Sequence, residues 1–115
     1  MPATIAPPER EIRPGGKEED RDDLTPQYNV VLLDDDYHTY DYVIEMLTRL
    51  FFLSTDEAYR RAVEVDATGR TIVITCELPQ AEFGRDQIHA YGADWRMTES
   101  KGSMSAIVEP ASGTV

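Results

Sequence analysis

A short apolar run that ends in three consecutive aspartates is the feature that most constrains this chain. Residues 28–33 read YNVVLL, and Asp34, Asp35 and Asp36 follow directly. Such a run, rich in β-branched residues, predicts a buried strand. Side chains alternate in direction along an extended chain, so the three carboxylates face different ways unless the chain bends after Leu33. We expect a bend that aims two of them at one point, and we call residues 34–36 the acidic corner.

Two helices are expected after the acidic corner. Thr39 is a suitable N-cap for a helix that begins near Tyr40. Its apolar face comprises Val43, Met46, Leu47, Leu50 and Phe51. Ser54 and Glu57 form a capping-box pattern at the start of the second helix. The apolar stripe of that helix and the glycine that stops it are Ala58, Ala62, Val65 and Gly69.

The second half of the chain predicts two more strands and one helix. Residues 70–77 (RTIVITCE) form a strand by their β-branched content, and residues 104–108 form the last strand after a polar loop, 97–103. Pro79 suits the first turn of the third helix. One side of that helix is expected to hold Ala81, Gly84, Ile88, Tyr91 and Trp95. The order β-α-α-β-α-β predicts a small α/β sandwich, a three-stranded sheet with helices packed on it.

Charge and composition divide the chain and limit its partners. Residues 1–25 hold few large apolar side chains, which predicts a disordered tail before one adaptor domain, 26–110, and a frayed end, 111–115. The net charge is −11, from 22 acidic and 11 basic residues, and most of it falls after residue 25. This field repels nucleic acid and attracts cationic partners, including free peptide amino termini.

The sequence shows no sign of secretion or of a membrane anchor. The only cysteine, Cys76, lies in an apolar strand pattern, which favours a buried, inert thiol over a nucleophile. No apolar run is long enough to span a bilayer, and no signal-peptide pattern follows Met1. We therefore expect a cytoplasmic protein without membrane contact.

Three interpretations of the acidic corner remain open from the residues alone. The first is a solvated turn in which Asp36 or Thr39 caps the next helix. The second is a catalytic or metal site, although no second acidic strand end completes one. The third is recognition of a cationic group, because an ammonium ion donates three hydrogen bonds and accepts none. We expect no catalytic residue, no metal and no cofactor.

Residues 28–43, YNVVLLDDDYHTYDYV, resemble the opening of the ClpS-type N-end-rule adaptors. Those adaptors show a hydrophobic strand, the pattern Asn-Asp-Asp-Tyr/Phe-Thr-Pro-Met-Glu-Phe-Val, and then a helix. The resemblance continues through residues 43–52 to the closing stretch 104–109 (MSAIVE). It implies the β-α-α-β-α-β fold and a protein that is an adaptor rather than an enzyme.

The resemblance also implies partners. An adaptor of this type binds substrate proteins through an amino-terminal Leu, Phe, Tyr or Trp, the N-degron. It delivers them to the amino-terminal domain of a Clp-type AAA+ unfoldase, and its flexible tail takes part in delivery.

The binding residues carry over position by position. The set that binds the peptide amino terminus is Asp34, Asp35, Asp36 and Asp66, with Asp35 expected to bind the α-amino group. The hydrophobic pocket is His38, Tyr40, Val43, Ala62, Val65 and Met104. Several positions depart from the family. Asp34 replaces the family's Asn, His38 its Thr, Asp66 its His, Tyr40 and Ala62 each a Met, and Met104 a Leu. On the docking surface, Pro79 and Gly84 replace the family's Glu and Lys.

The departures lead to further expectations. Like charges raise one another's pKa, so one of Asp34, Asp35 and Asp66 is expected to hold a proton in the empty site. For His38, an exposed side chain is favoured over a pH-dependent donor at the pocket mouth. The alternative function is a ClpS-like paralogue with altered or lost N-degron binding, which acts as a regulator or a general protein-interaction domain.

Overall fold

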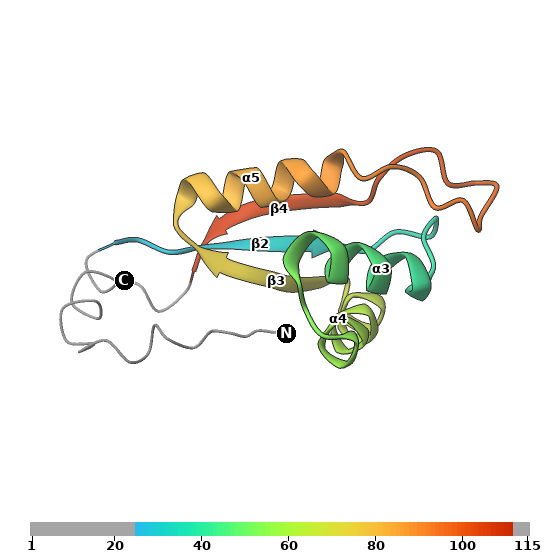
Figure 1. The fold of residues 1–115 in the computed structure, drawn as a ribbon, viewed down its shortest axis with the longest axis horizontal. Helices are drawn as coiled ribbons and strands as arrows, with labels where there is room; N and C mark the ends of the chain where they lie inside the picture. Colours follow the sequence, from blue (N-terminus) through green and yellow to red (C-terminus); the bar gives the residue numbers. More distant parts are fainter. Residues whose placement is uncertain (1–24, 112–115) are drawn as a thin grey trace.

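The computed structural model describes residues 25–111, and its strands form one antiparallel sheet (Figure 1). Strand β2 (Tyr28–Leu33) lies in the centre, between β3 (Arg70–Cys76) and β4 (Ser105–Pro110). Both pairings are antiparallel, and the register shifts once, between Val30 and Val31 on the β3 side. The central strand stops at Leu33, so the acidic corner lies at its end.

Three helices alternate with these strands within residues 25–111. They are α3 (Tyr40–Phe51), α4 (Thr55–Thr68) and α5 (Leu78–His89). Figure 1 shows α5 running beside β4, whereas α3 and α4 lie at the end of the sheet where β2 stops. The predicted β-α-α-β-α-β fold is confirmed. None of these helices has the length and apolar character needed to cross a membrane.

The helix ends form where the capping patterns predict them. The Thr39 hydroxyl accepts a hydrogen bond from the Tyr42 N–H at 3.1 Å, and α3 begins at Tyr40. The Ser54 hydroxyl accepts from the Glu57 N–H at 3.1 Å, and α4 begins at Thr55. Helix α4 ends at Gly69, whose φ of 92° lies in the left-handed region that favours glycine.

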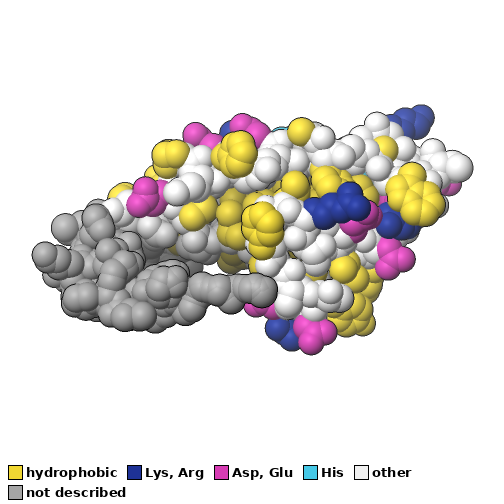
Figure 2. Space-filling model, viewed as in Figure 1, with side chains coloured by type: hydrophobic (Ala, Val, Ile, Leu, Met, Phe, Trp, Pro, Cys, Tyr) yellow, Lys and Arg dark blue, Asp and Glu magenta, His cyan; other side chains and the backbone are white. Residues whose placement is uncertain are grey.

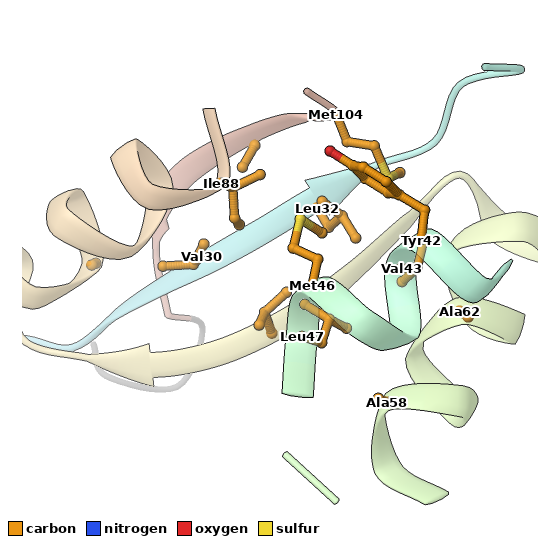
Figure 3. Packing of buried hydrophobic residues seen from close by; sticks show 13 residues of the cluster. Val30, Leu32, Tyr42, Val43, Met46, Leu47, Ala58, Ala62, Ile88 and Met104 are labelled. Carbon is orange, nitrogen blue, oxygen red and sulfur yellow. The ribbon is translucent and has the colours of Figure 1, made fainter. Parts of the chain in front are cut away.

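The core joins the end of β2 to α3. Figure 3 shows these side chains pointing toward one another from several elements. Large side chains of this cluster that are 1% exposed or less include Val30, Leu32, Tyr42, Met46, Leu47 and Ile88. Full burial of a Val, Leu or Met side chain is worth about 1.5–3 kcal/mol, so this cluster fixes α3 against the strand that ends in the acidic corner.

The third helix is shorter than predicted. It ends at His89, so Tyr91 and Trp95 do not continue its buried side, and Trp95 is 80% exposed. The helical spacing was misleading because Gly92 adopts a φ of 110°, which turns the chain out of the helix. Closer to the start of α5, Gly84 is buried, and a Cβ there would lie 3.1 Å from the Phe51 ring. The side of α5 that holds Gly84 therefore faces α3 and is not on the surface.

Two smaller differences concern the ends of the domain. The last strand covers Ser105–Pro110 rather than 104–108. The predicted tail and frayed end fall outside the described residues, apart from Thr25 and Ala111. The Ala111 N–H donates to the Gln27 carbonyl at 2.9 Å, so antiparallel pairing extends one residue beyond β4.

Candidate functional site

The acidic corner is fastened to the turn between α4 and β3. The Asp34 N–H donates to the Gly69 carbonyl at 3.0 Å. Burial raises the pKa of Asp34, although its side chain stays partly exposed. A backbone hydrogen bond lowers this pKa, and the negative charges of Asp66, Asp35 and Asp36 raise it. The four carboxylates predicted to bind an amino terminus therefore lie close enough to act on one another.

Asp35 has partners on its own side of the corner. Its carboxylate accepts the Tyr37 N–H at 2.8 Å, which forms a tight local turn. Both of its oxygens also face Nδ1 of His38, at 2.8 and 3.0 Å. With 28% of its side chain exposed, Asp35 stays within reach of a ligand.

The interpretation of His38 as an exposed side chain is wrong. Only 4% of the side chain is exposed. Its Nε2 lies 2.7 Å from the Gly102 carbonyl and 3.2 Å from the Ser100 hydroxyl, and its ring lies 4.4 Å from that of Tyr42. The local sequence favoured exposure because the residues that cover His38 come from the loop between α5 and β4, more than sixty positions away.

Tyr40 and Asp66 form a second pair across the corner. The Tyr40 hydroxyl donates to Oδ2 of Asp66 at 2.7 Å. That hydrogen bond raises the pKa of the Tyr40 phenol, because it stabilises the protonated form. The Tyr40 ring also meets the Tyr59 ring edge-on, with centroids 6.2 Å apart. The departure from Met at position 40 thus places a polar group over the substituted Asp66.

The apolar members of the predicted pocket are packed into the core. Val43, Ala62, Val65 and Met104 are each 3% exposed or less. Figure 3 shows Val43 on α3 near Ala62 on α4, and Met104 beside Tyr42. These four buried residues, which we call the apolar wall, come from α3, from α4 and from the position just before β4.

A hollow of about 640 Å³ opens on the other side of Asp35. It lies between the acidic corner and the loop from α5 to β4, and its lining residues are Asp35, Tyr37, His38, Thr98, Glu99, Lys101, Gly102 and Ser103. Figure 2 shows basic and acidic side chains side by side at this end of the molecule. Apart from Gly102, each residue that lines the hollow carries a polar group on its side chain, in contrast to the apolar wall.

Asp94 is a residue of this region that the sequence did not reveal. It is 1% exposed. Its carboxylate accepts from the Thr39 N–H and hydroxyl at 2.7 and 2.8 Å, and from the backbone and guanidinium of Arg96 at 3.0 and 3.1 Å. Burial alone would raise the pKa of Asp94, but these hydrogen bonds lower it to about 2. Asp94 thereby holds the loop after α5 against the N-cap of α3.

A single local signal existed for Asp94. An Asp two residues before a backbone donor is typical of an Asx turn, and the Arg96 N–H makes that contact. The other partner, Thr39, is 55 positions away, and no local sequence pattern predicts its contact with Asp94.

Comparison with known proteins identifies the family. The sequence profile of the ATP-dependent Clp protease adaptor protein ClpS matches residues 23–96. The chain belongs to the ClpS family. It is therefore an adaptor of the Clp protease and not an enzyme.

Individual ClpS proteins match at moderate identity. The ClpS protein of a Synechococcus sp. is 31% identical over 72 residues, which cover 62% of this chain and 79% of that protein. The ClpS protein of Vibrio atlanticus is 35% identical over 79 residues, covering 67% and 74%. The solved structure of Agrobacterium tumefaciens ClpS2 bound to L-phenylalaninamide is 26% identical, with a TM-score of 0.64, and covers 75% of this chain and 98% of that one.

Proposed function

We propose that this ClpS protein binds the free amino terminus of substrate proteins at the acidic corner and delivers them to the amino-terminal domain of a Clp-type AAA+ unfoldase. The observation that supports this most is the gathering of Asp34, Asp35, Asp36 and Asp66 beside an apolar wall. The relative ClpS2 was solved with L-phenylalaninamide, a molecule with an α-amino group next to a phenyl side chain. An acidic corner beside an apolar wall suits both parts of such a ligand.

In this proposal Asp35 is the main acceptor for the substrate's α-ammonium. Its carboxylate is partly exposed and lies at the end of the rigid central strand. Asp34 and Asp36 add negative charge, and Oδ1 of Asp66 is left for the ligand because Oδ2 accepts from Tyr40. A hydrogen bond to a charged group is worth about 1.5–3 kcal/mol, so Asp35 alone should account for at least a tenfold effect on affinity.

The first side chain of the substrate would occupy the pocket formed by His38, Tyr40, Val43, Ala62, Val65 and Met104. Ala62 is buried in the core on the α4 side, whereas Tyr40 adds bulk and a hydroxyl at the mouth. We propose that residues 26–110 form the binding domain, in the cytoplasm, and that residues 1–25 contribute to delivery. Removal of residues 1–25 should leave peptide affinity nearly unchanged and impair delivery of the substrate.

A second candidate function is favoured by a specific observation. Asp35 and Asp66, the two carboxylates nearest the expected ammonium, already have internal partners in His38 and Tyr40. A ClpS protein with these contacts could have lost N-degron binding and act as a regulator of the protease, or bind another cationic motif.

Peptide binding separates the two candidates. Fluorescence anisotropy would measure the affinity of short peptides that begin with Phe, Leu, Trp or Arg, each beside its amino-acetylated form. The proposed function predicts that acetylation abolishes binding of at least one peptide, because it removes the ammonium charge. If acetylation changes no affinity, amino-terminal recognition is wrong and the second candidate stands.

A further inference from the structure

His38 faces a hydrogen-bond acceptor at each ring nitrogen. Nδ1 lies 2.8 and 3.0 Å from the two carboxylate oxygens of Asp35, and Nε2 lies 2.7 Å from the Gly102 carbonyl. A neutral imidazole donates at one nitrogen and accepts at the other, whereas the imidazolium donates at both. The observed contacts are therefore satisfied together only when His38 is protonated.

The neutral ring has no equivalent arrangement. The Ser100 hydroxyl, 3.2 Å from Nε2, could donate to a neutral ring, and it already accepts from the Asp94 N–H at 2.8 Å. The Gly102 carbonyl would then face a nitrogen lone pair at 2.7 Å, which is repulsive. Loss of the proton therefore breaks the link between the acidic corner and the loop at one of its two ends.

The groups around His38 come from three parts of the chain. Asp35 is the charged group in direct contact, and Tyr42 of α3 packs against the ring. Glu99 and Lys101, from the loop between α5 and β4, line the same hollow and carry opposite charges. The family profile ends at residue 96, so the part of this loop that holds Glu99, Lys101 and Gly102 lies beyond the matched residues.

We propose that protonated His38 is an internal competitor for the substrate's α-ammonium at Asp35, and that its deprotonation removes the competing positive charge together with one of its two hydrogen bonds. This inference rests on the proposed function, because it concerns the same carboxylate. Two cations compete for one acceptor, so binding of an amino terminus releases the proton of His38. Affinity for a free amino terminus should consequently rise with pH. His38 acts here as a positioning residue.

The test is a pH series of peptide affinities between pH 5.5 and 7.0. An α-amino group titrates near 7.7–8.0, so the peptide keeps its charge throughout this range, while an imidazole ordinarily titrates within it. We expect a Phe-initiated peptide to bind wild-type protein several-fold more tightly at pH 7.0 than at 5.5. Competition with a single proton limits the change to about tenfold per pH unit.

Two variants complete the series. His38→Gln removes the titrating ring, and we expect it to bind at pH 5.5 with an affinity close to its own value at 7.0. His89→Gln is the matched control, because His89 is the other histidine of the chain and lies at the end of α5, where it accepts from the Ala106 N–H of β4. It should follow the wild type.

The outcomes separate this inference from the proposed function. Acetylation-sensitive binding with the same pH slope in wild type and His38→Gln overturns the competition and leaves the function intact. Binding that ignores acetylation at every pH overturns the function and the competition with it. Nitrogen NMR of the imidazole gives a second readout. We expect protons on both ring nitrogens of His38 at pH 5.5 in the empty protein, and one unprotonated nitrogen there contradicts the competition at Asp35.

Discussion

Two acidic regions meet at the start of α3 and behave in opposite ways. Asp94 is almost fully buried, accepts four hydrogen bonds, and has a pKa lowered to about 2. Asp34 of the acidic corner is partly exposed, lies among like charges, and has a raised pKa. An ionised carboxylate thus stabilises the fold at Asp94, whereas the folded protein disfavours the ionised form of Asp34.

The difference lies in the number of donors around each carboxylate. Asp94 has as many as it can use, so it has nothing left to offer a ligand. The corner has four carboxylates and few cationic partners, and a bound ammonium would supply the missing donors. Binding and fold stability should therefore respond to different aspartates, and the following experiments test that separation.

The largest effect on stability is expected for Asp94→Ala. It leaves the Thr39 N–H and hydroxyl and the Arg96 N–H without their acceptor, and the Arg96 guanidinium with Glu45 as its remaining partner, which should lower the free energy of unfolding by about 3 kcal/mol. Urea titration measures this, with Asp86→Ala as the control, since Asp86 is exposed and pairs only with Arg85. An Asp94→Ala protein as stable as wild type would show that the loop is not held through this carboxylate. Asp94→Asn, which keeps an acceptor, should be affected less.

The contribution of Asp94 should disappear in acid. Its pKa in the folded protein, about 2, lies below its ordinary value of 3.8, so its stabilisation is present above pH 4 and is lost as the pH falls toward 2. The stability difference between wild type and Asp94→Asn should shrink by about 2 kcal/mol over that range. Unfolding curves at pH 5, 4, 3 and 2.5 check this, and a difference that stays constant contradicts the assigned hydrogen bonds.

Asp34→Asn should act in the opposite direction and more weakly. The raised pKa of Asp34 means that the folded state disfavours its charged form, so removal of the charge should stabilise the protein near neutral pH. Because the side chain is partly exposed, solvent screening should limit the gain to about 0.5 kcal/mol. The gain should vanish in acid and shrink in high salt. A loss of stability at pH 7 would contradict the crowding of the corner.

The sequence predicted the elements whose signals are local. The β-branched run before Asp34, the caps Thr39 and Ser54, and the stop at Gly69 each specify their structure within a few residues. The acidic corner followed from these, because a buried strand that ends in carboxylates must turn outward. The third helix was predicted too long, because spacing alone does not reveal that Gly92 has a positive φ.

The parts of the site that the sequence missed depend on distant residues. His38 looks exposed until the loop with Ser100 and Gly102 is placed over it, and Asp94 looks like a loop residue until Thr39 is brought to it. Both contacts join the corner to the connection between α5 and β4. Neither has a periodicity or motif, so only the three-dimensional structure shows that this loop belongs to the site.

Asp35 provides the most direct test of the separation between binding and stability. Affinity for a Phe-initiated peptide with a free amino group, and the free energy of unfolding, would be measured for wild type, Asp35→Ala and the exposed control Asp56→Ala. We expect Asp35→Ala to weaken binding at least tenfold while its free energy of unfolding stays within about 1 kcal/mol of wild type, and Asp56→Ala to bind normally. An Asp35→Ala protein that is folded and binds the free-amine peptide as tightly as wild type would contradict the assignment of the acidic corner as the amino-terminus site.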